Sequence, residues 1–321
     1  INDIIIRAYN DISVQFNRSN VQTNLKFSSH ESYVSFVENL LKRVGKSCTV
    51  ATPVIDAAIE PHIRACVTHE SFSPPGSGPM LTLRIARHKS ISLDELVTLE
   101  LAPKPIMDYL SLLVQSGHVT ILIAGEVGTG KTTLVRALAN SVPDEEAILV
   151  IEDTHEIVLD RQFVRTLLTR EPNTEGAGKI TPAMAIRTGL RLAMNRIVLG
   201  EMRDAEAAEA FIDVCASGHA GISTIHSKSP RDALGRLELF LARAQNRVSQ
   251  EVIRRQISNA LSVVIYIGVD RKSGKRRIIQ VSEVGSAAEG SITLSNIFTY
   301  DSGNPGTWKR DMGVSKYQNA L

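Results

Sequence analysis

The sequence predicts an α/β protein with a parallel sheet, preceded by a smaller α+β domain. From Val119 onward, short apolar runs alternate with helical stretches, which is typical of strands joined by crossover helices that cover both faces of a parallel sheet. Before Met80, β-type runs are short and are separated by Asn- and Ser-rich connections around a single helical pattern. A length of 321 residues also favours two domains over one.

The composition is that of a globular protein, with 43% hydrophobic and 22% charged residues. The 36 Lys and Arg against 34 Asp and Glu leave a formal charge of +2, which supplies no broad positive field, so we expect no direct nucleic-acid partner. Cys48, Cys66 and Cys215 lie far apart and form neither a disulfide framework nor a CxxC metal site, which favours a reducing, cytoplasmic setting.

The chain contains no apolar run near the roughly 20 residues that cross a bilayer, and no basic-then-apolar signal segment opens it. Any membrane association is therefore expected to be peripheral. Ile1 stands where an initiator methionine would, and we expect native sequence to precede it.

Residues 1–88 are expected to form the small α+β domain. Apolar β-type runs at 4–6 and 12–16 predict strands, and apolar residues recurring at helical spacing from Ser32 to Val44 predict a helix. The Pro- and Gly-rich segment 73–79 predicts a turn or loop before a strand at 80–85.

The remainder is divided into a linker at 89–104, a larger domain at 105–300 and a weakly ordered tail at 301–321, because the chain after Val284 is rich in Gly, Ser and Asn. Apolar runs predict strands at 119–124, 147–151, 196–199, 221–225 and 261–267, and helices are predicted from about Thr132, Pro182 and Ala205 and over 243–260.

A phosphate-binding loop is predicted at residues 125–132, which read Gly-Glu-Val-Gly-Thr-Gly-Lys-Thr and match GxxxxGK[ST] between a strand and a helix. Glycines let backbone N–H groups turn toward a phosphate, and the helix N-terminus adds partial positive charge. Lys131 would bridge the β- and γ-phosphates of ATP, and the Thr132 hydroxyl would hold Mg²⁺. The nucleotide-binding residues are predicted to be Gly125, Gly128, Thr129, Gly130, Lys131, Thr132 and Thr133.

Two further apolar strands end in acids. Glu201 follows residues 197–200, and Glu152 directly follows the apolar run at 147–151. Carboxylates at these positions beside a P-loop can coordinate Mg²⁺ with Thr132 and orient or deprotonate water. We predict that Glu152 and Glu201 are both catalytic and metal-binding, and which of them is the general base stays open.

Two histidines lie seven residues apart at 219 and 226, the second at the end of an apolar strand. An imidazole there could donate to the γ-phosphate and report its presence. Because ligands of α/β proteins bind at the carboxyl ends of strands, His226 is predicted to be catalytic. His219 is predicted to bind the nucleotide, with a structural histidine as the alternative.

Together these elements resemble the ATPases shared by type II secretion, type IV secretion and type IV pili. In that family they correspond to a Walker A loop, an Asp box at 151–153 with Glu156, an atypical Walker B at Gly200-Glu201 followed by Arg203, and a His box from Gly218 to His226. The likeness is greatest to the tight-adherence pilus and archaeal-type branch, with the conjugation ATPases next. It is densest over 81–284 and is loose over 4–80.

This resemblance implies a homohexamer whose subunits have a small N-terminal domain and a RecA-like ATPase domain joined by a flexible linker. It also implies a cytoplasmic motor, peripherally attached to the inner membrane, that acts on a polytopic platform protein. Arg84 matches an arginine that reaches the phosphates from the N-terminal domain, and Arg203 matches one that follows the Walker B acid. A guanidinium suits developing γ-phosphate charge.

Two features depart from parts of this family. Glu126-Val127 stands in the P-loop where the family usually has small residues, and the three cysteines do not supply the tetracysteine zinc module of type II extension ATPases. The leading hypothesis is thus an ATP-driven pilus or secretion motor. Alternatives are a conjugative secretion ATPase, a nucleotide-gated scaffold with little turnover, and a DNA-translocating or phosphotransfer enzyme.

Overall fold

A computed structural model describes the chain in two compact units. Unit 1 comprises residues 1–89, 153–156 and 168–180, and unit 2 comprises 90–152, 157–167 and 181–321. Within them, the structure describes residues 3–16, 19–60, 62–73, 78–85, 91–173, 176–245, 247–288, 290–311 and 315–317.

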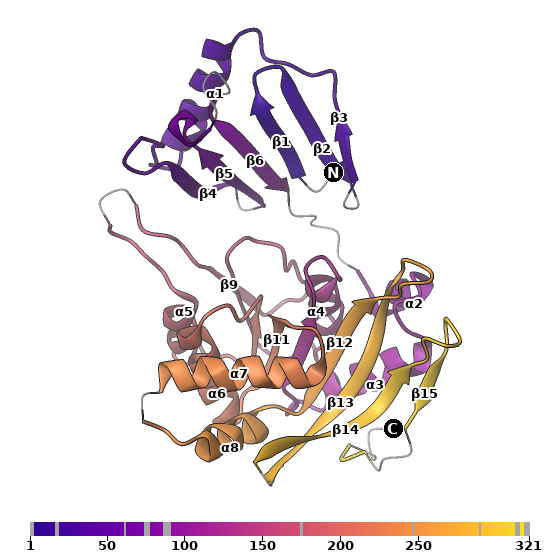
Figure 1. The fold of residues 1–321 in the computed structure, drawn as a ribbon. Helices are drawn as coiled ribbons and strands as arrows, with labels where there is room; N and C mark the ends of the chain where they lie inside the picture. Colours follow the sequence, from indigo (N-terminus) through magenta and orange to yellow (C-terminus); the bar gives the residue numbers. More distant parts are fainter. Residues whose placement is uncertain are drawn as a thin grey trace. The chain divides into compact units, whose positions relative to one another are not determined.

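Unit 1 contains a six-stranded antiparallel sheet with one helix, α1, on one face (Figure 1). Helix α1 begins with a capping box, in which Ser29 and Ser32 exchange side-chain to backbone hydrogen bonds. Its buried face carries Tyr33, Val37 and Leu41, which pack on the sheet. The elements are β1 Asp3–Ala8, β2 Asp11–Phe16, β3 Ser19–Gln22, α1 His30–Lys42, β4 Val54–Glu60, β5 Ile63–Thr68, the 3₁₀ turn η1 Glu70–Phe72, and β6 Met80–Ile85, in the sheet order β3-β2-β1-β6-β5-β4.

Unit 2 is built on a nine-stranded sheet whose order is β15-β14-β13-β12-β7-β11-β10-β8-β9. The strands β12, β7, β11, β10 and β8 run parallel, whereas β13, β14 and β15 are antiparallel additions. The strands are β7 Ile121–Gly125, β8 Ile148–Glu152, β9 Val164–Leu168, β10 Arg196–Leu199, β11 Ala220–His226, β12 Val263–Val269, β13 Arg276–Ala288, β14 Ser291–Tyr300 and β15 Trp308–Arg310.

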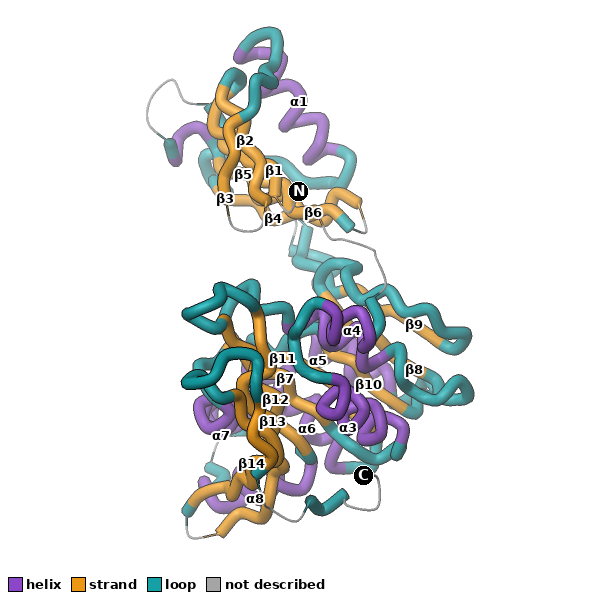
Figure 2. The backbone as a smooth tube through the Cα atoms, turned by 90° about the vertical axis from the view of Figure 1, so that its right-hand side faces the viewer, coloured by secondary structure: helices purple, strands orange, loops and turns teal. Residues whose placement is uncertain are grey.

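Helices cover both faces of this sheet, as Figures 1 and 2 show from two directions. Side chains of α2, α3 and α4 form one core with one face, and side chains of α5, α6, α7 and α8 form a second core with the other. The helices are α2 Leu93–Thr98, α3 Lys104–Gln115, α4 Lys131–Ala139, α5 Pro182–Gly189, α6 Ala205–Ala216, α7 Pro230–Ala244 and α8 Gln250–Ala260. In the described part of the chain, no helix has the length and apolar character needed to span a bilayer.

The structure differs from the sequence-based expectation in the helices near residue 245. A single helix was expected over 243–260, but α7 ends at Ala244 and α8 begins after its N-cap Ser249. Gln245 has φ −103° and ψ 85°, which is incompatible with continuing a helix. The Ser249 hydroxyl then accepts the backbone N–H of Val252, which starts the new helix.

The expected linker and tail also differ. The predicted boundary between residues 88 and 89 falls on 86–90, outside the described residues, and the predicted turn at 73–79 falls largely on 74–77, also outside them. Residues 89–104 were expected to form a linker, yet they contain α2, and Leu96, Leu101 and Ala102 are buried in the core. Beyond Val284, where weak order was expected, the chain forms the end of β13, β14 and β15, and Ser315 is buried.

The parallel strands bring their carboxyl ends to one edge of the sheet. Gly125 at the end of β7 is in register with His226 at the end of β11, and Leu199 of β10 is in register with Ile151 of β8. The acids that follow these strands therefore lie near the P-loop, as ligand sites in open α/β sheets do.

Candidate functional site

The P-loop connects β7 to α4 through a backbone that only glycine adopts easily. Gly128 and Gly130 have φ values of +70° and +99°, in the left-handed region where a Cβ is costly. Gly130 is the N-cap of α4. The Thr129 hydroxyl donates to the carbonyl of Glu126 at 2.9 Å, which closes the turn. Thr132 and Thr133 are partly exposed in the first turn of α4.

Gly125 is required by close packing rather than by its φ. A Cβ at this position would lie 2.5 Å from the carbonyl oxygen of Ile267 and 2.8 Å from Thr129 Oγ1. The strand end and the loop therefore approach as closely as backbone atoms allow. This geometry fits a loop that wraps a phosphate with its N–H groups.

Lys131 is the first residue of α4 and is only 7% exposed. Its Nζ donates to the carbonyls of Gly125 and Glu126, both at 3.0 Å, and lies 3.2 Å from His226 Nδ1. The loop thus curls around this ammonium group, next to the N-terminus of α4, where the first N–H groups have no acceptor within the helix. An ammonium and a helix N-terminus together are the donor set that binds polyphosphate.

A chain of charged and polar contacts runs from Lys131 to Arg203. His226 Nε2 lies 2.8 Å from Glu201 Oε1, and Arg203 Nε donates to Glu201 Oε2 at 2.8 Å. Because Lys131 can only donate, His226 Nδ1 is the acceptor, and the imidazole is assigned its proton on Nε2, which donates to Glu201. Glu201 is thereby held on both oxygens beside the P-loop lysine.

The pKa values of these groups follow from their burial. Burial lowers the pKa of His226, the cations Lys131 and Arg203 act in the same direction, and Glu201 opposes them. This fits the neutral imidazole assigned above. Burial also lowers the pKa of Lys131 to about 8, with Glu201 opposing this shift and Arg203 adding to it.

The lowered pKa of Lys131 predicts that ATP binding takes up protons in alkaline solution. Free protein is partly unprotonated at Lys131 above pH 8, whereas the phosphates favour the ammonium and raise its pKa, so affinity falls as pH rises through about 8. Titration calorimetry at about pH 8.5, in two buffers of different ionisation enthalpy, measures the uptake. We expect proton uptake by the parental chain and none by Lys131→Met; equal uptake by both would contradict the assignment.

Glu152 lies at the same edge but in different surroundings. It ends β8 and is 6% exposed, and its Oε2 accepts the backbone N–H of Ile157 at 2.9 Å. A Cβ on Gly200 would lie 3.3 Å from Glu152 Cβ, so the ends of β8 and β10 are close. The structure therefore brings both acids to neighbouring strand ends, with Glu201 in the contact chain that includes Lys131.

The structure does not bring His219 to the P-loop of its own chain. His219 immediately precedes β11, while His226 ends it. Because an extended chain rises about 3.3 Å per residue, the two histidines are roughly 20 Å apart, at opposite ends of β11. The His219 Nδ1 lies 3.3 Å from Ser217 Oγ. His219 therefore lies in the turn before β11, away from the P-loop of its own chain, and a nucleotide contact by His219 stays a prediction.

Arg84 belongs to β6 of unit 1, where its Nε donates to Asp3 Oδ1 at 3.2 Å and its side chain is 67% exposed. Arg64 of β5 is directly opposite Arg84 in the sheet register, so the two guanidinium side chains share one sheet face. A phosphate contact by Arg84 stays a prediction.

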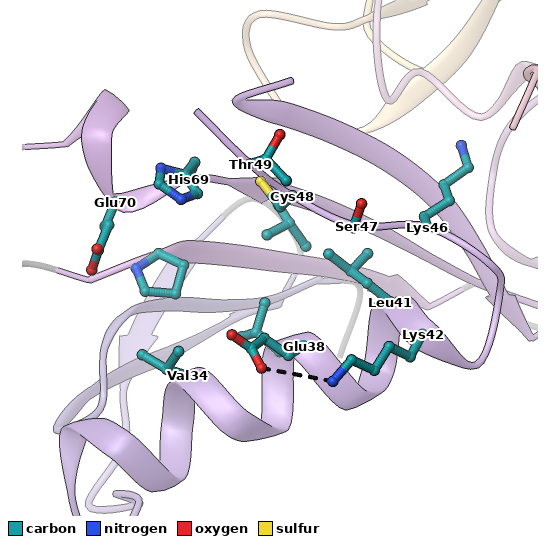
Figure 3. Close-up of a pocket in the computed structure, with 13 residues that line it drawn as sticks. Val34, Glu38, Leu41, Lys42, Lys46, Ser47, Cys48, Thr49, His69 and Glu70 are labelled. Carbon is teal, nitrogen blue, oxygen red and sulfur yellow. Dashed lines mark ion pairs between the residues drawn. The ribbon is translucent and has the colours of Figure 1, made fainter. Parts of the chain in front are cut away.

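A hollow of about 420 Å³ lies in unit 1 between α1 and the segment 46–49 (Figure 3). Its floor is apolar, with Val34 and Leu41 among its residues, and its rim carries both charge signs, including the ion pair of Lys42 with Glu38 at 3.9 Å. These residues belong to unit 1 and the P-loop to unit 2. None of the residues that line the hollow belongs to the P-loop.

A Mg²⁺ site needs no cluster of protein ligands in a P-loop. Among the residues that the structure describes, no three His, Cys, Asp or Glu side chains are grouped so that they could hold a metal ion. Mg²⁺ usually keeps several waters and binds through one or two protein oxygens plus the substrate phosphates. Thr132 at the start of α4 and Glu201 at the end of β10 offer such oxygens, so the residues fit this ion.

The comparisons with known proteins agree with this geometry. A model of the family described as "Type II/IV secretion system protein" matches residues 63–290. A Mycobacterium tuberculosis protein named for conjugal transfer is 25% identical over 323 residues, covering 99% of this chain and 88% of the relative. The type IV secretion system protein PtlH of Bordetella pertussis is 37% identical over 181 residues, covering 54% of this chain and 52% of that protein.

Solved structures share the fold at low sequence identity. The pilus retraction motor PilT with bound ADP has a TM-score of 0.60 at 19% identity, covering 92% of this chain and 79% of that one. The ATPase DotB of Legionella pneumophila has a TM-score of 0.62 at 18% identity, covering 87% and 75%. The predicted α/β, RecA-like fold is confirmed. The chain therefore belongs to the type II/IV secretion system protein family, and it is an ATPase of that family.

Proposed function

We propose that this ATPase is a Mg²⁺-dependent homohexameric motor at the cytoplasmic face of the bacterial inner membrane. It would drive pilus assembly, pilus retraction or protein secretion through a polytopic platform protein. The observation that carries the catalytic part is the chain of contacts from Lys131 through His226 to Glu201 and Arg203 at the mouth of the P-loop. Family membership supports the rest.

Each group in this chain has a defined task in hydrolysis. The Lys131 ammonium neutralises charge on the β- and γ-phosphates, and backbone N–H groups of the loop bind the β-phosphate. Mg²⁺, held by Thr132 and Glu201, would neutralise further phosphate charge. The oxygen of water forms a bond to the γ-phosphorus as the bond to the β–γ bridging oxygen breaks, which leaves ADP and inorganic phosphate.

Glu201 is the better candidate for orienting and deprotonating that water. Its carboxylate contacts His226, which contacts Lys131, so it lies on the side of the loop where the γ-phosphate would be. Glu152 is more buried, and one of its oxygens accepts the Ile157 N–H. We infer that Glu152 supports the site and the metal shell, while His226 and Arg203 hold Glu201 until the γ-phosphate draws the Arg203 guanidinium away.

Arg84 would act from the N-terminal domain. It is an exposed cation on a sheet face shared with Arg64, and an arginine fork suits the charge that develops on a transferring phosphoryl group. If Arg84 contacted the phosphates in one arrangement of the domains and not in another, ATP would bind the two arrangements with different affinity. A conformational change driven by a ligand requires such a difference. This role accounts for how hydrolysis is converted to motion.

The machine served by the motor is a pilus or a secretion system, and the tight-adherence pilus branch remains our preferred proposal. A conjugative type IV secretion role is the second candidate. The relative named for conjugal transfer aligns over 99% of this chain, which favours it specifically. A pilus motor and a conjugative secretion ATPase would both release inorganic phosphate, so a phosphate assay does not separate them. The substrate that is moved and the membrane partner distinguish the two functions.

The oligomeric part is tested by mass photometry of the purified chain with Mg²⁺ and a non-hydrolysable ATP analogue. We expect a species of about six times the 35.0 kDa of one chain, because the family resemblance implies a closed ring of six subunits. A stable monomer or dimer at micromolar concentration with saturating nucleotide would contradict the hexamer. It would leave the P-loop assignment intact.

A further inference from the structure

The β12–β13 hairpin carries an unusual concentration of positive charge beside the P-loop. Residues 271–277 include five Lys or Arg residues. Two of them are bound to the end of α2: Lys275 Nζ lies 2.7 Å from Glu100 Oε1, and Arg277 lies 2.7 Å from Glu100 Oε2. Arg277 also donates to the Glu100 carbonyl. These contacts fix the backbone on both sides of Arg276.

Arg276 points in the other direction, toward the P-loop. Successive residues of a strand face opposite sides, so the ion pairs of Lys275 and Arg277 leave Arg276 on the far side from Glu100. The Arg276 Cδ lies 3.6 Å from the position that a Cβ would take on Gly130. Because Gly130 is the N-cap of α4, the stem of this arginine runs beside the helix N-terminus that would bind phosphate.

The hairpin lies on the side of the P-loop away from the catalytic acid. Strand β7 has β11 as one neighbour and β12 as the other (Figure 2), and Gly125 is in register with His226 on one side and Ile267 on the other. The γ-phosphate belongs near Lys131, His226 and Glu201. The α-phosphate and the nucleoside, at the other end of the bound ATP molecule, would then lie toward β12 and β13.

We propose that Arg276 binds the α-phosphate of the bound nucleotide, as a second cation on the side of the P-loop opposite His226 and Glu201. The proposal rests on the function proposed above and adds a residue from outside the four sequence motifs. A guanidinium is suited to this task because it donates to two phosphate oxygens at once. Glu100 acts indirectly, as the residue that positions the hairpin.

This placement predicts a specific kinetic signature. ATP and ADP share the α- and β-phosphates, so the contact stabilises both to the same extent. A contact to the α-phosphate changes little between the ground state and the transition state, because the bond that breaks joins the γ-phosphorus to the β–γ bridging oxygen and the charge develops on the β- and γ-phosphates. Its loss therefore raises KM and Kd without lowering kcat. A purely structural defect in the loop would lower kcat as well.

The test compares Arg276→Ala with Arg271→Ala, which removes the same charge from an exposed position in the same hairpin. Titration with ADP and with a non-hydrolysable ATP analogue gives Kd, and phosphate release gives KM and kcat. We expect Arg276→Ala to weaken both ligands by at least about tenfold, the lower end of the range for a lost charged hydrogen bond. We expect kcat to change by less than about twofold.

Arg271→Ala should leave all three values near those of the parental chain, and Arg276→Lys should fall between the parental chain and Arg276→Ala. Parental binding of ADP by Arg276→Ala would overturn the inference while leaving the P-loop function standing. Weakening of the ATP analogue alone would also overturn it, since that pattern indicates a γ-phosphate contact. Failure of the parental chain to bind either nucleotide would overturn the inference and the proposed function together.

Discussion

Replacing Lys131 with Ala is expected to abolish measurable ATP turnover, a loss of at least about 1,000-fold, the upper range for removing one preorganised electrostatic donor. The ammonium is held by the Gly125 and Glu126 carbonyls at the centre of the loop. Without it, the charge that develops on the β- and γ-phosphates has no compensating cation at that place. Steady-state phosphate release measures the loss.

The Lys131→Ala chain should still fold, because Ala is the best helix former and the change removes a buried amine from α4. A thermal midpoint close to that of the parental chain checks this. Lys104→Ala is the matched control, since Lys104 is an exposed residue of α3 that pairs with Asp94 and Asp108. Turnover by Lys131→Ala equal to that of the control would remove the P-loop from the catalytic account.

Replacing Glu201 with Gln is expected to reduce turnover by at least about 100-fold, the lower range for loss of a general base, while ATP binding survives. The amide preserves the shape of the side chain and one acceptor oxygen for the Arg203 or His226 contact. It cannot take a proton from water or place a negative charge beside Mg²⁺. Single-turnover phosphate release, together with nucleotide titration, separates the chemical step from binding.

Glu152→Gln is the informative comparison, because its amide oxygen can still accept the Ile157 N–H. We expect a smaller loss of turnover than at Glu201. Equal losses at the two positions would mean that both carboxylates act on the water or the metal. Glu201→Gln turnover within about threefold of the parental rate would contradict a general-base role for Glu201.

The local parts of the site are the parts that the sequence predicts well. The P-loop is a contiguous motif, and the requirement for glycine at 125, 128 and 130 follows from close packing and backbone conformation at those positions. The acid-tipped strands are also predictable, since parallel strands bring their carboxyl ends together. The sequence does not predict that His226 lies between Lys131 and Glu201 and contacts both side chains.

His219 shows a limit that strand geometry explains. Seven residues along one strand separate two side chains by the full length of β11. Residues 219 and 226 therefore cannot both face the P-loop of the same chain. This could have been inferred from the predicted strand itself. The nucleotide contact of His219 stays a prediction, and the strand geometry excludes it only for the P-loop of the same chain.

Arg276 shows a limit of another kind. It follows the P-loop by more than a hundred residues, and its position beside Gly130 depends on β12 lying next to β7 and on the ion pairs of Glu100. Neither is visible in the spacing of residues. The same holds for β13 and β14, whose polar and small residues resemble loop sequence until they pair in the sheet.

The most direct test of the account is steady-state phosphate release by the unaltered chain supplied with ATP, with and without Mg²⁺. The contact chain from Lys131 to Glu201 predicts continuous release that depends on Mg²⁺ and saturates with ATP. Tight ATP binding without phosphate release would contradict a motor. That result would instead identify a nucleotide-gated switch built on the same loop.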